Sequence, residues 1–102
     1  MAKILYNEAI ESFARDIKNI IPSSMIYLFG SYVTGKAKKD SDIDIAVFSD
    51  YFKGMEKVKA DMILYDIAEK YDCDIQPIAF IYDDMKSDFV KDEILRYGKI
   101  IS

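Results

Sequence analysis

The chain has 102 residues, a formal net charge of −4 and a pI of about 4.7, whereas domains that bind nucleic-acid duplexes usually have a basic face and a high pI. With 51% hydrophobic and 31% charged residues, it has the composition of an ordinary globular protein, and no apolar run approaches the roughly 20 residues of a membrane span. Cys73 is the only cysteine and there is no histidine, so an internal disulfide is impossible and a zinc site or Cys–His nucleophile is not expected.

Residues 2–20 are predicted to form an amphipathic helix, because apolar residues such as Phe13 and Ile17 recur at steps of three and four. Acidic residues interrupt this segment, so it does not resemble a signal peptide, and we expect a cytoplasmic protein. The continuous apolar run of residues 25–29 predicts a buried strand that ends at Gly30. A short helix is expected to start near Ser31, and residues 43–48 form the second predicted strand.

The second half of the chain continues the alternation of helices and strands. A helix is predicted over residues 53–70, a strand over 73–81 and a last amphipathic helix over 87–101, with Ser87 as its cap. Pro77 interrupts the strand, which favours a sheet edge or a bulge. We expect one domain over residues 1–102, of the α+β class, with helices packed on one face of a small sheet and the other face open for a site.

Two acidic residues stand at the start of the second predicted strand. Side chains alternate along a strand, so Asp42 and Asp44 share one face while Ile43 and Ile45 point into the core. Two neighbouring carboxylates repel each other unless a cation lies between them, and Mg²⁺ typically takes one or two carboxylates plus phosphate oxygens. Seen alone, such a pair is more often a solvated strand edge than a metal site.

A glycine and a serine directly follow the first predicted strand. Gly30 permits a tight turn, and backbone N–H groups of a helix starting at Ser31 would attract an anion. Gly35 would let the loop fold back towards the acidic pair. Gly-Ser after a strand is usually only a turn, but together with the acidic pair it predicts a site for a nucleoside triphosphate and its metal ion.

Gly30-Ser31, ten intervening residues and then Asp42-x-Asp44 resemble the signature of DNA polymerase β-like nucleotidyltransferases. The surrounding segment, GSYVTGKAKKDSDIDIAVFSD, is especially similar to the minimal nucleotidyltransferase (MNT) group, and the resemblance covers essentially the whole chain. It implies a small mixed sheet with helices packed on one face. It also implies that Gly30 and Ser31 hold the triphosphate and that Asp42 and Asp44 bind Mg²⁺.

The family usually supplies a third carboxylate from a later strand, as a metal ligand or as the base for the attacking hydroxyl. Asp72 and Asp74 are the candidates, and we choose Asp74. Many relatives carry an arginine where this chain has Thr34, which puts the triphosphate contacts in question. Lys36 could compensate, although a solvated lysine is the simpler interpretation.

The resemblance implies transfer of a nucleoside monophosphate, AMP from ATP, to an acceptor hydroxyl. MNT proteins commonly pair with HEPN-domain ribonucleases as toxin–antitoxin systems, which implies adenylylation of a toxin tyrosine. A different hypothesis is a non-catalytic module that binds nucleotide or neutralises its partner by contact alone. A third is a small-molecule nucleotidyltransferase that borrows a dimer mate to complete its pocket.

Overall fold

The computed structural model describes residues 2–35 and 42–102. Its main elements in chain order are α1 (Ala2–Ile20), β1 (Met25–Phe29), α2 (Ser31–Thr34), β2 (Ile43–Phe48), α3 (Lys57–Ala68), β3 (Ile75–Phe80) and β4 (Lys99–Ile100). Two short 3-10 helices, η1 (Asp50–Phe52) and η2 (Tyr82–Lys86), and a π-helical segment, η3 (Val90–Leu95), lie in the connections. None of the described helices is both long and apolar enough to cross a membrane.

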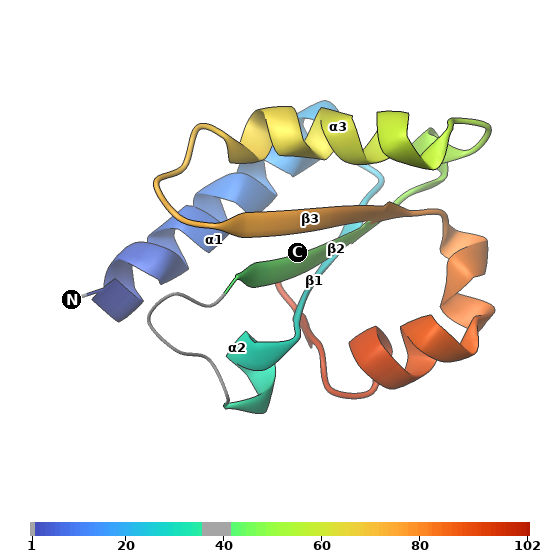
Figure 1. Cartoon of the computed structure of the whole chain (residues 1–102). Coiled ribbons are helices and arrows are strands. Elements are labelled where there is room, and N and C mark those ends of the chain that lie inside the picture. The colour runs from blue at the N-terminus through green and yellow to red at the C-terminus, as the bar shows by residue number, and fades with distance from the viewer. Residues whose placement is uncertain (1, 36–41) are drawn as a thin grey trace.

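The four strands form one mixed sheet in the order β3-β2-β1-β4 (Figure 1). Strand β1 is antiparallel to β2 and β4, whereas β2 and β3 are parallel. The predicted α+β class with a small mixed sheet is therefore confirmed. β3 is an edge strand, which agrees with the position predicted from Pro77.

The alternation along β2 divides the core between the two faces of the sheet. Ile43, Ile45 and Val47 are fully buried in one cluster with residues of α1 and α3. On the opposite face, Ala46 and Phe48 pack against η3, which lies across the sheet from α3 (Figure 1). α1 and α3 thus cover one face as predicted. The expectation that the other face is open for a site is wrong, because η3 packs there and buries Ala46 and Phe48 completely.

Two predicted boundaries differ from the structure. The helix expected over 53–70 begins at Lys57, because Gly54 has a φ of +85° and forms a turn instead. The helix expected over 87–101 is wrong in its second half, where Lys99 and Ile100 pair with β1 as strand β4. Gly98 marks the change, since its N–H donates to the Ile94 carbonyl at 2.7 Å and closes the helical segment.

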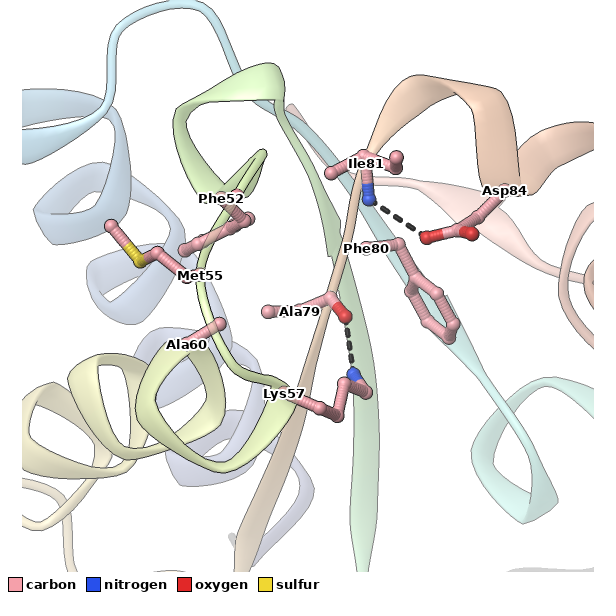
Figure 2. A pocket seen from close by; sticks show the side chains of 9 residues that line it. Phe52, Met55, Lys57, Ala60, Ala79, Phe80, Ile81 and Asp84 are labelled. Carbon is pink, nitrogen blue, oxygen red and sulfur yellow. Dashed lines mark hydrogen bonds between the residues drawn. The ribbon is translucent and has the colours of Figure 1, made fainter.

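A pocket of about 210 Å³ lies where β3 ends, between η1, α3 and η2 (Figure 2). Phe52, Met55 and Ala60 form its apolar wall, and the Lys57 ammonium lies over the Phe80 ring at 4.7 Å from the centroid. This pocket contains none of the residues that the sequence singles out as a site.

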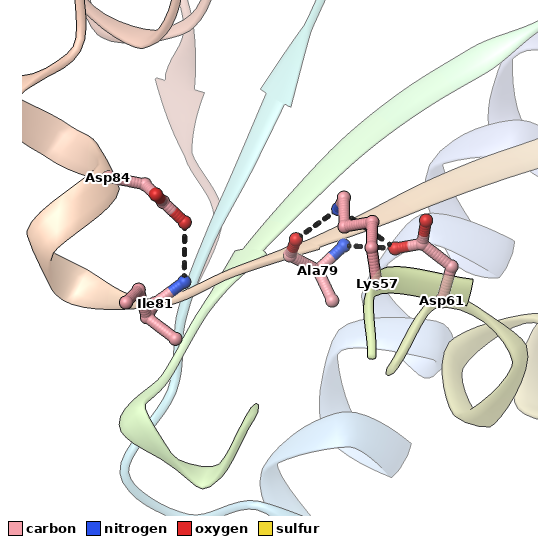
Figure 3. A network of polar contacts seen from close by, with 5 residues as sticks. All are labelled: Lys57, Asp61, Ala79, Ile81 and Asp84. Carbon is pink, nitrogen blue, oxygen red and sulfur yellow. Dashed lines mark hydrogen bonds and ion pairs between the residues drawn. The ribbon is translucent and has the colours of Figure 1, made fainter. Parts of the chain in front are cut away.

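Side chains cap the outer edge of β3 beside this pocket (Figure 3). The Ala79 N–H donates to Asp61 at 2.8 Å, Lys57 donates to the Ala79 carbonyl, and the Ile81 N–H donates to Asp84 at 2.9 Å. Because Pro77 also lacks an N–H, few backbone groups along this edge can pair with another strand. This protects β3 against edge-to-edge association.

Candidate active site

The predicted site residues meet at one end of the sheet, where β1 ends and β2 and β3 begin. Phe29 at the end of β1 pairs with Asp44 of β2, which brings Gly30 beside that aspartate. Asp44 in turn pairs with Gln76 of β3, and the Ile43 N–H donates to the Asp74 carbonyl at 2.8 Å. This register puts Asp74 next to Asp42 on the neighbouring parallel strand.

Gly30 makes the closest approach to the acidic residues. Its φ of 77° and ψ of −148° lie in a region that side-chain-bearing residues rarely adopt. A Cβ atom at this position would lie 2.2 Å from Asp44 Oδ2. Only glycine therefore lets the chain turn from β1 into α2 while the Asp44 carboxylate keeps its place.

The turn after Gly30 is short and hydrogen-bonded. Val33 and Thr34 donate their N–H groups to the Gly30 carbonyl at 3.1 and 3.2 Å. The four-residue helix α2 begins at Ser31 as predicted and ends at Gly35, whose φ of 78° gives a left-handed cap. Ser31, the first residue of α2, is half-exposed and directly follows Gly30.

Three carboxylates influence one another at this end of the sheet. A hydrogen bond with Asp74 and the negative charge of Asp74 raise the pKa of the exposed Asp42. Burial, followed by the charge of Asp74, raises the pKa of the half-buried Asp44. Hydrogen bonds with Asp42 and from Gln76 lower the pKa of Asp74.

This donor set is suited to a hard divalent cation. Carboxylate oxygens are the ligands that Mg²⁺ prefers, and a cation would relieve the repulsion that raises two of the three pKa values. Within residues 2–35 and 42–102, no group of three such side chains is placed to hold a metal ion by itself. With nucleotides, Mg²⁺ commonly binds through one or two carboxylates together with phosphate oxygens.

A match to a known protein family identifies the family of this chain. Residues 10–101 match the family described as "Nucleotidyltransferase domain". The chain belongs to the nucleotidyltransferase family. The resemblance inferred from the Gly-Ser and Asp-x-Asp pattern is thereby confirmed, and the protein is a nucleotidyltransferase.

Individual relatives agree with this assignment. The chain is 33% identical over 97 residues to a protein of Methanocaldococcus jannaschii named as a candidate protein adenylyltransferase, covering 89% of this chain and 93% of that protein. The crystal structure of a nucleotidyltransferase candidate from Sulfolobus solfataricus shares the fold, with a TM-score of 0.74, 17% identity and coverage of 97% of this chain and 81% of the other. A structure titled as a toxin–antitoxin with AMP-PNP superimposes with a TM-score of 0.64 at 27% identity, covering 90% of this chain and 72% of the other.

The structure places most of the site residues predicted from the sequence close together. Gly30, Asp42, Asp44 and Asp74 meet at one end of the sheet, with Ser31 directly after the turn. Gly35 lies one short helix further along, and Lys36 lies outside the described residues.

The two alternatives for the third carboxylate are placed differently. Asp74 contacts Asp42 and affects the pKa of Asp44, whereas Asp72 is not among the causes that shift either pKa and acts, together with Asp74, on Cys73. Burial is the main cause that raises the pKa of the Cys73 thiol, which disfavours the reactive thiolate.

Two residues near this candidate site were not predicted. Gln76 donates from its Nε2 to Asp74 Oδ1 at 2.6 Å, and the Tyr65 hydroxyl donates to Gln76 Oε1 at 2.5 Å. Gln76 follows Asp74 by two positions and so shares its side of β3, a signal that the sequence contains. Tyr65 comes from α3, and nothing in the sequence links it to the strand.

Proposed function

We propose that this nucleotidyltransferase transfers AMP from ATP to a hydroxyl group of a partner protein. The observation that carries the proposal is the meeting of Asp42, Asp44 and Asp74 beside the Gly30 turn. The candidate protein adenylyltransferase from Methanocaldococcus jannaschii supports a protein acceptor. The toxin–antitoxin structure with AMP-PNP supports an adenine nucleotide as substrate.

In this proposal Asp42 and Asp44 hold Mg²⁺, with Asp74 as the third carboxylate. The Gly30 backbone and the Ser31 hydroxyl would contact the triphosphate. Gly35 and Lys36 are the further candidates for these contacts, and Lys36 lies outside the described residues. When bound, Mg²⁺ neutralises charge on the triphosphate and on the departing pyrophosphate. The protein itself supplies orientation, because the strands fix the carboxylates and the glycine turn fixes the backbone next to them.

The reaction is an in-line displacement at the α-phosphorus of ATP. The acceptor oxygen forms a new bond to this phosphorus, the bond to the bridging oxygen breaks, and pyrophosphate leaves with that electron pair. The acceptor hydroxyl gives its proton to Asp74. The hydrogen bond from Gln76 Nε2 to Asp74 Oδ1 at 2.6 Å fixes one oxygen of this carboxylate and leaves the other to accept the proton.

The acceptor that we propose is a tyrosine hydroxyl of a HEPN-domain toxin, with this chain as the antitoxin. The family resemblance implies such a partner, and the toxin–antitoxin relative at 27% identity supports a partner of the toxin class. The net charge of −4 argues against a nucleic-acid acceptor, because phosphate backbones are bound by basic surfaces.

Isothermal titration of ATP, with Mg²⁺ and with EDTA, tests the site directly. The wild type should bind ATP in a Mg²⁺-dependent manner, and the Asp42→Asn/Asp44→Asn variant should lose this dependence. Label should then pass from ATP to the co-encoded HEPN-domain protein and remain on tyrosine. Intact, Mg²⁺-loaded protein that neither binds ATP nor labels its partner would refute the proposed activity.

A contact-only antitoxin is the second candidate function, and Thr34 favours it. The Thr34 hydroxyl donates to the Gly30 carbonyl at 3.3 Å, so it serves the turn and offers no guanidinium group to a triphosphate. A contact-only antitoxin should still neutralise its partner after the Asp42→Asn/Asp44→Asn change. An adenylyltransferase should lose neutralisation in the same variant.

A further inference from the structure

A chain of side-chain hydrogen bonds runs from α3 to the third carboxylate. The Tyr65 hydroxyl donates to Gln76 Oε1 at 2.5 Å, and Gln76 Nε2 donates to Asp74 Oδ1 at 2.6 Å. The directions of the two bonds are linked, because an amide has one accepting and one donating end. An ionised Asp74 can only accept, so Gln76 must turn its NH₂ group towards it and leave its oxygen for Tyr65.

The Tyr65 side chain lies at the surface of the protein. Its side chain is 38% exposed, so its burial in the core is limited. Tyr65, Gln76 and Asp74 instead line a common groove of about 170 Å³ between α3 and the start of β3. The hydrogen-bond chain therefore ends at a place that ligands can reach.

Asp74 needs such support more than Asp44 does. Asp44 lies within β2, half-buried and directly beside Gly30, whereas Asp74 precedes β3 and is exposed. An exposed aspartate samples several rotamers in solution. A fixed hydrogen bond to one carboxylate oxygen restricts this freedom and leaves the other oxygen for the acceptor or for a bound cation.

We propose that Gln76, held in place by Tyr65, is a positioning residue that orients Asp74 for the reaction. The inference rests on the proposed function, since it assigns Gln76 and Tyr65 to the same site. Neither residue needs to touch ATP. Their loss should therefore lower the rate of AMP transfer and the apparent Mg²⁺ affinity more than it changes the KM for ATP.

The test is a Mg²⁺ titration of ATP-saturated protein, followed by calorimetry, on the wild type and on Tyr65→Phe, Gln76→Ala and the double variant. Each single change should weaken the apparent Mg²⁺ affinity about three- to tenfold, the range expected for one hydrogen bond. Because Tyr65 acts through Gln76, Tyr65→Phe should have no further effect once Gln76 is alanine. Thermal unfolding should shift little in all three.

Tyr82→Phe is the matched control, because the Tyr82 hydroxyl also makes an exposed hydrogen bond, to the Ser23 carbonyl at the opposite end of the sheet. Its Mg²⁺ dependence should equal that of the wild type, and Asp74→Asn should show the largest loss. If Asp74→Asn weakens Mg²⁺ binding while Tyr65→Phe and Gln76→Ala behave like Tyr82→Phe, the positioning role is refuted and the proposed function stands. A wild type without Mg²⁺-dependent ATP binding would overturn both.

Discussion

Replacing Gly30 with alanine would test whether its close approach to Asp44 shapes the active site. The backbone at Gly30, with φ 77° and ψ −148°, is strained for any residue with a side chain, at a cost of about 1–3 kcal/mol. The new methyl group would also lie 2.2 Å from Asp44 Oδ2. The carboxylate would have to withdraw by about 1 Å or more to reach an ordinary van der Waals separation.

We expect two separable effects of Gly30→Ala. The free energy of unfolding, measured by urea denaturation, should fall by about 1–3 kcal/mol because of the backbone strain. AMP transfer should fall by about 10²-fold, because a displacement of roughly 1 Å in a reacting group can have that effect. Isothermal titration should also show weaker Mg²⁺-dependent binding of ATP at temperatures where the variant is fully folded.

Gly54→Ala separates strain from the effect on the site. Gly54 also has a positive φ, +85°, but a Cβ atom there would meet nothing within 4 Å. This variant should lose stability through the backbone and keep its Mg²⁺-dependent ATP binding. If Gly30→Ala bound Mg²⁺ and ATP as tightly as Gly54→Ala does, the contact with Asp44 would have no role in the site and this reasoning would fail.

Two further predictions concern the carboxylates. Burial raises the pKa of Asp44 above its ordinary value of 3.8, so the contribution of its protonated form to stability is lost as the pH rises through the folded-state pKa. The Asp44→Asn variant should therefore have a higher melting temperature than the wild type at pH 7 in EDTA, and this difference should shrink towards pH 3.8. Equal melting temperatures of the two proteins at pH 7 would contradict this. Asp61→Ala removes the acceptor of the Ala79 N–H and should lower the free energy of unfolding in urea by about 1–2 kcal/mol. Asp83→Ala, which breaks only an exposed ion pair with Lys86, should change it by about 0.5 kcal/mol or less, and equal losses would show that the cap on β3 contributes nothing.

The sequence was most informative where one local pattern dominates. The apolar runs of β1 and β2 were recognisable because both strands are buried in the middle of the sheet. The alternation along β2 also placed Asp42 and Asp44 on one side and Ile43 and Ile45 in the core. Strand β4 could not be recognised, because two residues are too few to show a period, although Gly98 was a signal against the helix expected there.

The rest of the site depends on contacts between distant segments. The choice between Asp72 and Asp74 required the parallel register of β2 and β3, which the hydrogen bond from Ile43 to Asp74 fixes. Tyr65 reaches Gln76 only because α3 packs along β3. No local propensity encodes such a pairing, since it arises from tertiary packing.

The two ends of β3 show how an acidic chain separates structural from functional carboxylates. At the far end, Asp61 and Asp84 each accept a hydrogen bond from a backbone N–H, so their negative charge serves the fold. At the near end, Asp42 and Asp74 face each other, and Asp44 is half-buried beside Gly30, where only a glycine fits. The charge repulsion and the burial of Asp44 oppose the stability of the free protein, and a cation bound between the carboxylates would relieve both. Local conflicts concentrated at one end of an otherwise consistent fold are the pattern expected of an active site.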